Sequence, residues 1–318
     1  MTQPAKSVLR LGTRGSLLAR AQSSMVAQML ERHHPGLRVE VSIIRTTGDQ
    51  ITDKPLYEFG GKGLFTKELE QALLAGTIDF AVHSFKDVPV TMPLVDQAEL
   101  GIAAVPERED ARDALVCSRA RSITELPRGA KVGTGSLRRR AQLLAHRPDL
   151  IVEPVRGNID TRVRKCREGE YDAVILAMAG LKRASLLDPA IMHVLESTEL
   201  LPAPGQGALA LQCRSKDQTT RSLLSVLNDS MTETCVNLER QVVRLLAGDC
   251  HSPIAALAEA TGNGLSFRAL VGHRDGAPPV IAASALWAAT GTDAASLPDE
   301  VFRKLIDQGA RILLDGRM

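Results

Sequence analysis

Two short stretches place arginines beside a glycine- and hydroxyl-rich turn at the start of an expected helix. They are GTRGSLLARAQ at residues 12–22 and GTGSLRRRAQ at residues 133–142. If Ser136 caps a helix, the arginines at 138–140 lie in its first turn, where free N–H groups already make the helix end positive. Added cations are unfavourable there unless an anion binds. We therefore expect both turns to bind an anion that the chain does not itself supply.

Polar residues of suitable chemistry follow four expected strands, which are VLRLG (8–12), DFAVH (79–83), KVG (131–133) and LIVEPV (150–155). In open α/β sheets, ligands bind beyond the carboxyl ends of the strands. We therefore expect the residues after these strands to form one rim. They are Thr13, Arg14, Ser16, Ser84, Lys86, Asp87, Thr134, Ser136, Arg138, Arg139, Arg156, Gly157, Asn158 and Arg162.

The number of arginines favours a ligand with many carboxylates or phosphates. An exposed helix end stabilises an anion by only about 0.3–1 kcal/mol, whereas micromolar binding needs about −8 kcal/mol. Several charge-assisted hydrogen bonds of about 1.5–3 kcal/mol each would suffice. Two plainer interpretations stay open: the arginines at 138–140 form a solvated helix face, and Asp87 is only a turn or cap residue.

Cys250 lies in LAGDCHSP, directly after an expected helix end. A lone cysteine is usually a small buried hydrophobe, but this loop position and the neighbouring Asp249 and His251 suggest greater exposure. A nucleophile or a covalent attachment point is the alternative.

The segment GGKG at 60–63 resembles a phosphate-binding loop. No Ser or Thr follows its lysine, so it is not a Walker motif.

Composition excludes several classes of protein. The 318 residues carry a net charge of only +2 and 3% aromatic residues, which disfavours a nucleic-acid binder. The five cysteines are scattered, so we expect neither a disulfide framework nor a bound metal. No apolar stretch approaches the roughly 20 residues of a membrane span, and the N-terminus lacks the apolar run of a secretory signal. We expect a cytoplasmic protein that does not bind membranes.

Strand-like and helix-like segments alternate through the first two-thirds of the chain, which is typical of α/β domains. The repeated turn indicates two related, doubly wound domains. From about residue 230, a helix, two hairpin signals and a closing helix (DEVFRKLIDQGARILL) indicate a small α+β domain. We expect domain 1 at 1–104 with 205–226, domain 2 at 105–204 and domain 3 at 227–318.

Together these segments resemble one family, porphobilinogen deaminase, also called hydroxymethylbilane synthase. The matching segments run in order: GTRGSLLARAQ, GGKGLFTKELE, AVHSFKDVP, EREDARDA, VGTGSLRRRAQL, RGNIDTRV, YDAVILAMAGLKR, LPAPGQGAL and LAGDCHSPIAALA. The resemblance implies two domains like the halves of periplasmic binding proteins. It also implies a monomeric transferase of tetrapyrrole (haem) biosynthesis that joins four porphobilinogen molecules head to tail and releases ammonia.

The resemblance also implies roles for single residues. Cys250 would carry a dipyrromethane cofactor through a thioether, and Asp87 would be the catalytic carboxylate. Residues 46–63, with Lys62, resemble a loop over the active site, and Glu58 stands where some members have lysine. The residues that would bind cofactor and substrate carboxylates are Arg14, Ser16, Lys86, Thr134, Ser136, Arg138, Arg139, Arg156, Gly157 and Arg162. Arg140 need not take part.

Two rival hypotheses make different predictions. A non-catalytic two-domain binder of a polycarboxylate anion would need neither Asp87 nor an adduct on Cys250. Nucleic-acid binding through the arginines at 138–140 and the RVRKCR segment (162–167) would show a steep salt dependence.

Overall fold

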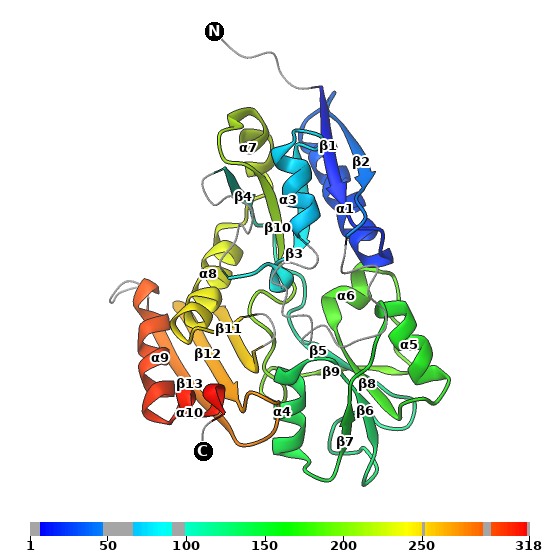
Figure 1. Cartoon of the computed structure of the whole chain (residues 1–318), viewed down its shortest axis with the longest axis vertical. Helices are drawn as coiled ribbons and strands as arrows, with labels where there is room; N and C mark the ends of the chain where they lie inside the picture. Colours follow the sequence, from blue (N-terminus) through cyan, green and yellow to red (C-terminus); the bar gives the residue numbers. More distant parts are fainter. Residues whose placement is uncertain (1–6, 47–65, 91–98, 250–251, 289–293, 317–318) are drawn as a thin grey trace. The chain divides into compact units, whose positions relative to one another are not determined.

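The structure is a computed structural model that describes residues 7–46, 66–90, 99–249, 252–288 and 294–316 (Figure 1). The chain divides into two compact units, one made of residues 1–109 and 208–233 and the other of residues 110–207 and 234–318. The finer boundaries expected for three domains stay a prediction. Among the described residues, no helix combines the length and the apolar character needed to cross a membrane.

The first unit contains a five-stranded sheet in the order β2-β1-β3-β10-β4. Strand β1 is parallel to both β2 and β3, whereas β10 is antiparallel to both β3 and β4. The carboxyl ends of β1 and β3 therefore lie at the same edge. The strands are β1 Val8–Thr13, β2 Arg38–Ile43, β3 Phe80–Ser84, β4 Leu100–Ala104 and β10 Leu209–Arg214.

Helices cover both faces of this sheet. Buried residues of α1 (Leu17–His33) and α7 (Gln218–Ser225) pack with Leu9, Leu11 and Phe80 on one face. On the other face, α3 (Lys67–Leu74) packs its leucines against Ala81 and Leu100. A single 3-10 turn, η2 (Phe85–Asp87), follows β3.

The second unit contains a sheet with the order β7-β6-β8-β5-β9. It repeats the pattern of the first unit: β6 is parallel to β7 and β8, and β5 is antiparallel to β8 and β9. Helix α4 packs on one face, and α5 and α6 pack on the other. The elements are β5 Asp113–Val116, β6 Lys131–Gly133, α4 Leu137–His146, β7 Ile151–Glu153, α5 Ile159–Arg167, β8 Ala173–Ala177, α6 Met178–Arg183 and β9 Met192–Leu195.

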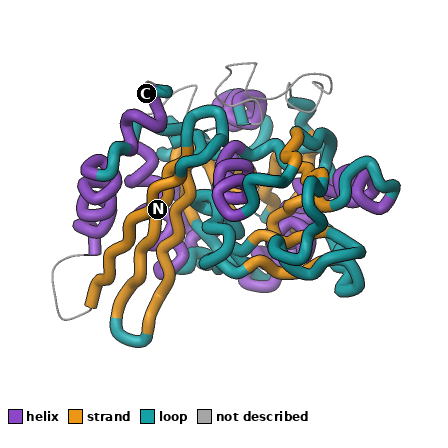
Figure 2. The backbone as a smooth tube through the Cα atoms, turned by 90° about the horizontal axis from the view of Figure 1, so that it is seen from below, coloured by secondary structure: helices purple, strands orange, loops and turns teal. Residues whose placement is uncertain are grey.

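A separate antiparallel sheet, β11-β12-β13, completes the second unit, and Figure 2 shows its three strands side by side. The expected first hairpin is present, with a loop at residues 262–263. The closing segment forms two helices instead of the one expected, because Gly309 between them adopts a left-handed φ of 94°. Helix α8 (Ser230–Leu245) begins in the range of the first unit and continues into that of the second. The remaining elements are β11 Ile254–Thr261, β12 Gly264–Gly272, β13 Val280–Ala288, η3 Ala294–Ser296, α9 Leu297–Asp307 and α10 Ala310–Asp315.

The predicted fold class is confirmed: two related α/β sheets with helices on both faces and a small α+β part at the C-terminal end. One strand in each five-stranded sheet, β10 in the first and β5 in the second, runs antiparallel to both of its neighbours, which the alternation of strands and helices did not predict.

Candidate functional site

Strands β1 and β3 bring their trailing residues to one edge of the first sheet, as predicted for neighbouring parallel strands. Ser16 caps α1, and its Oγ accepts a hydrogen bond from the Ala19 N–H at 3.3 Å. Further along α1, the Gln22 amide donates to Ser84 Oγ at 3.1 Å, which ties the helix to the end of β3. The edge therefore carries Arg14, Ser16, Lys86 and Asp87.

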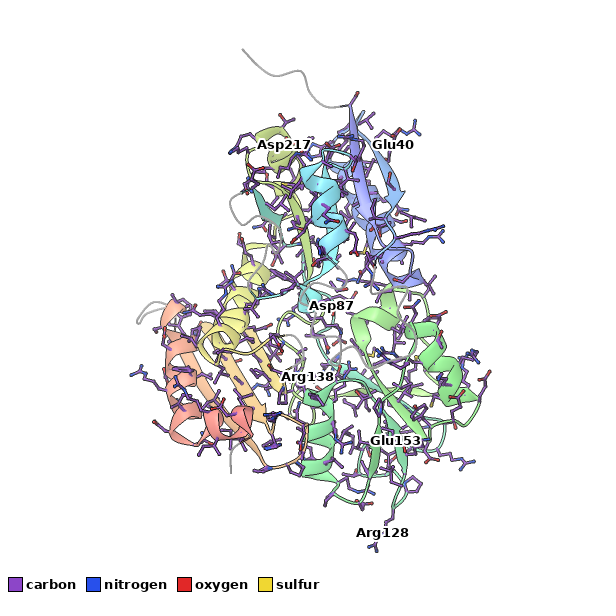
Figure 3. The ribbon with its side chains drawn as sticks, in the orientation of Figure 1. Glu40, Asp87, Arg128, Arg138, Glu153 and Asp217 are labelled. Atoms are coloured by element: carbon purple, nitrogen blue, oxygen red, sulfur yellow. The ribbon has the colours of Figure 1, made fainter. Side chains whose placement is uncertain are left out.

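Asp87, labelled in Figure 3, is the last residue of the 3-10 turn after β3. Its side chain is exposed. Arg14 and Lys86 are half-buried. The turn is anchored by Phe85, which is buried and donates its N–H to the carbonyl of Ala208 at 3.0 Å. A fixed turn with an exposed carboxylate is suitable for contact with a ligand.

A buried hydrogen-bonded chain lies behind this edge. The Gln212 amide donates to Glu70 Oε1 at 3.1 Å, and its oxygen lies 3.0 Å from His83 Nε2. Because a carboxylate can only accept here, the orientation of the amide is set, and His83 Nε2 must carry a proton and donate. All three side chains are buried, and sequence reasoning assigned a role to none of them.

His83 is neutral at neutral pH. Burial lowers its pKa to about 4, against the raising effect of the Gln212 hydrogen bond. The positive charge of Arg14 lowers the pKa further, and the negative charge of Asp87 raises it. The imidazole therefore lies within the electrostatic field of two predicted site residues.

The second turn, at residues 133–136, has the predicted cap. Ser136 Oγ accepts a hydrogen bond from the Arg139 N–H at 3.4 Å, and α4 begins at the next residue. Thr134 is buried, and its Oγ1 accepts from the Ser136 N–H at 3.2 Å. Strands β6 and β7 are parallel neighbours, so this turn and the residues after β7 lie at one edge of the second sheet.

Arg138 and Arg139 do not form a solvated helix face, so that interpretation is wrong for them. Their side chains are only 4% and 7% exposed, and both contact the fully buried carboxylate of Asp113. The distances are 3.0 Å from Arg138 Nη2 to Oδ2 and 2.7 Å from Arg139 Nη2 to Oδ1. The chain thus supplies part of the anion that we expected to come from outside.

The compensation is incomplete, since two guanidinium groups share one carboxylate. Burial lowers the pKa of Arg138 to about 10; the charge of Asp113 opposes this effect and that of Arg139 adds to it. Within the described part of the chain, the Nε atoms of both arginines are buried and have no hydrogen-bond partner. Buried N–H groups are rarely left unsatisfied, so these atoms require a further acceptor, from a water molecule or from a ligand.

The residues after β7 add further donors to the same edge. Nε and Nη2 of Arg156 are buried without a hydrogen-bond partner among the described residues. Gly157 has a φ of 105°, and a Cβ there would lie 2.6 Å from Thr161 Cγ2, so the turn requires glycine. Arg162 Nε donates to the Gly157 carbonyl at 2.8 Å. Arg140, which need not take part in ligand binding, donates to the Val152 carbonyl.

Several predicted residues lie outside the described part of the chain, namely Cys250, Glu58 and Lys62. The residues next to Cys250 in the described chain are joined: Asp249 Oδ1 accepts from the Ser252 N–H at 2.9 Å. In the described ranges, no group of three or more His, Cys, Asp or Glu side chains is placed to bind a metal ion.

Comparisons with known proteins match one family along most of the chain. Residues 9–222 match the family model of the porphobilinogen deaminase dipyrromethane cofactor binding domain, and residues 233–307 match that of its C-terminal domain. Porphobilinogen deaminase of Roseiflexus sp. is 44% identical over 98% of this chain and 100% of its own length. That of Xanthomonas oryzae pv. oryzae is 48% identical over 97% of this chain and 99% of its own length.

Among solved structures, the methionine binding protein MetQ aligns at 12% identity with a TM-score of 0.45, covering 71% of this chain and 92% of its own. The two family models together span most of the sequence, and the relatives match at well above 30% identity. This chain therefore belongs to the porphobilinogen deaminase family.

Proposed function

We propose that this protein is a porphobilinogen deaminase, a transferase that condenses four porphobilinogen molecules head to tail with release of ammonia to give hydroxymethylbilane. One observation of the structure carries the proposal. Arg138 and Arg139 form a buried, under-compensated pair whose Nε–H groups have no partner among the described residues, and they lie within the region that matches the cofactor binding domain. Buried cations with unmet hydrogen bonds favour a carboxylate ligand.

The residues present fit a dipyrromethane cofactor with acidic side arms. When bound through the sulfur of Cys250, the dipyrromethane supplies the pyrrole carbon to which the first substrate unit is joined. We propose that Arg138, Arg139 and Arg156 bind its carboxylates, because their N–H groups that lack a partner in the described part of the chain are the donors such carboxylates require. Further carboxylate ligands in this proposal are Arg14, Ser16, Lys86, Thr134, Ser136, Gly157 and Arg162.

Asp87 is proposed as the catalytic carboxylate. Positive charge develops on the substrate pyrrole as ammonia leaves, and a nearby carboxylate stabilises that charge. The same side chain can take up the proton that is lost when two pyrroles are coupled. Its exposure after a turn anchored by Phe85 supports this role.

We further propose that the protein works as a monomer in the cytoplasm, on a small-molecule substrate, without nucleic acid or membrane. Near-neutral charge and the scarcity of aromatic residues support the absence of a nucleic-acid partner. The alternative, a non-catalytic binder of a polycarboxylate anion, is not favoured, since it accounts for neither the family match nor the cofactor binding domain.

The attachment test is intact-protein mass spectrometry. The wild-type protein should carry an addition equal to two linked pyrrole units, and Cys250→Ser should lack it. Cys166→Ser, which changes a half-buried cysteine of the second unit, is the matched control and should keep the addition. A fully active wild-type protein without the added mass would refute the proposal.

The catalytic test compares Asp87→Asn with Glu40→Gln, an exposed carboxylate on β2 of the same unit. Loss of a general acid–base group costs about 10²–10⁴-fold in rate. Asp87→Asn should therefore keep its circular dichroism spectrum and lose at least about 100-fold in kcat, whereas Glu40→Gln should match wild type. A rate for Asp87→Asn within a few-fold of wild type would remove Asp87 from this role.

A further inference from the structure

Asp113 is the first residue of β5, and its side chain is fully buried at the point where three other side chains converge. Its Oδ2 accepts a hydrogen bond from Arg138 Nη2, and its Oδ1 accepts from Arg139 Nη2. The amide of Gln206 also donates to Oδ1, at 2.8 Å. One carboxylate therefore links two arginines that follow each other in the sequence.

Each guanidinium group is also held in place through its second terminal nitrogen, Nη1. Arg138 Nη1 donates to the Leu201 carbonyl at 2.6 Å, and Arg139 Nη1 donates to the Ile175 carbonyl at 2.9 Å. A planar guanidinium group with both terminal nitrogens bound cannot rotate about its stem without losing a hydrogen bond. The direction in which each Nε–H points is thereby set, and these are the atoms that lack an acceptor in the described chain.

The charges of the three side chains do not cancel. Asp113 carries one negative charge against the two positive charges of Arg138 and Arg139, which leaves one net positive charge in a buried place. Without Asp113 the two cations would repel each other at short range. With a second carboxylate from the chain, no charge would remain to attract a ligand.

We propose that Asp113 is a positioning residue for carboxylate recognition: it fixes the orientation of Arg138 and Arg139 and leaves the pair with one positive charge for an acidic arm of cofactor or substrate. The inference rests on the proposed function, because it assigns these arginines to that ligand. It makes Asp113 a requirement for binding, although Asp113 itself contacts no ligand in this scheme.

The test measures two quantities in Asp113→Asn: the fraction of purified protein that carries the dipyrromethane mass, and the KM and kcat for porphobilinogen. The amide cannot accept from both arginines, since its NH₂ group would face one of their donors. We expect the loaded fraction to fall well below half. In the loaded protein, KM should rise about tenfold or more, with a smaller change in kcat, as for loss of binding that acts equally on ground and transition states.

Asp113→Glu provides a second measurement that does not depend on Asp113→Asn folding. It retains the negative charge but lengthens the side chain, so the loaded fraction should stay close to wild type while KM rises several-fold. The matched control is Asp149→Asn. Asp149 also pairs with an arginine, Arg147, but at the opposite end of α4. Asp149→Asn should leave the loaded fraction and KM unchanged.

The outcomes separate two kinds of failure. If wild type carries the cofactor and turns over, but both Asp113 variants keep wild-type loading and KM, the positioning role is wrong and the proposed function stands. A lower KM in Asp113→Asn would show that Asp113 competes with the ligand for the arginines, and would also overturn the inference. A wild-type protein with neither adduct nor turnover would instead refute the proposed function.

Discussion

Acidification should destabilise the first unit through His83, and the size of the effect follows from its burial. The pKa of this imidazole is lowered from 6.5 to about 4 in the folded protein. Below pH 6.5 the unfolded chain therefore binds a proton that the folded chain does not, so stability falls as the pH falls. The loss begins near the unfolded pKa and is complete once the pH is below the folded pKa.

Its magnitude can be worked out from these two values. A difference of about 2.5 pKa units corresponds to about 3 kcal/mol at 1.36 kcal/mol per unit. At pH 5.0 most of this is already lost, and the linkage relation gives a cost of about 2 kcal/mol relative to pH 7.5. That is a large share of the roughly 5–15 kcal/mol by which a protein domain is stable.

The variant that isolates this effect is His83→Gln. Glutamine does not titrate, and its amide can still donate to the oxygen of Gln212, which accepts from His83 in the wild type. Urea unfolding followed by far-UV circular dichroism at pH 7.5 and pH 5.0 gives the free energy of unfolding. Hydrogen exchange of peptides from β3 identifies the transition of the first unit. The acid-induced loss should be smaller in His83→Gln than in wild type by about 2 kcal/mol.

His33, exposed on α1 of the same unit, supplies the control. Most of the wild-type pH dependence should persist in His33→Gln. Equal losses of stability in wild type and His83→Gln would refute the reasoning, because the buried imidazole would then contribute nothing to the acid sensitivity.

Two other substitutions, the first with a matched control, test contacts within single units. Asp79 is buried and accepts from Arg10 Nε at 3.1 Å and from the Arg10 backbone N–H at 2.8 Å, so Asp79→Ala should lower the free energy of unfolding by about 2–3 kcal/mol. Glu99→Gln, which removes an exposed ion pair, should change it by less than about 1 kcal/mol in the same urea titration; similar losses in both would contradict this argument. Gly157→Ala should cost about 1–3 kcal/mol, because it forces a side chain into a left-handed conformation against Thr161. It should also reduce the loaded fraction seen by mass spectrometry, and unchanged melting and loading would show that the turn adapts.

Local features of the site could be predicted from the sequence. The caps at Ser16 and Ser136 depend on contacts three residues along the chain, so the turn residues alone indicate them. The shared edge of β1 and β3 follows from two short strand-like segments and the rule for parallel sheets.

The contacts that fix the arginines could not be predicted in this way. Asp113 and Arg138, which form a hydrogen bond, are 25 residues apart in the sequence, and Gln206 and Asp113 are 93 residues apart. Strand β5 is four residues long and buried on both faces, so it shows no alternation that would mark it as a strand. A carboxylate at the head of an entirely apolar run, DALV, is the one local sign that this position has a buried partner.

The buried chain through His83 was missed for the same reason. Gln212 lies in β10, which joins the first sheet although it lies far from β3 in the sequence. The residues of β10 beside Gln212 are buried on both faces of the sheet. Periodicity cannot show which earlier strand such a segment joins. The break at Gly309, by contrast, could have been found, since glycine in the left-handed region is a common end of a helix.

The position of β10 has a consequence for the newly synthesised chain. This strand lies between β3 and β4, yet it is encoded more than 100 residues after β4, beyond the whole five-stranded sheet of the second unit. While the ribosome is still translating that intervening stretch, β3 and β4 each present an unpaired edge. The sheet of the first unit therefore stays incomplete, with edges that can pair wrongly, until about two-thirds of the protein has emerged from the ribosome.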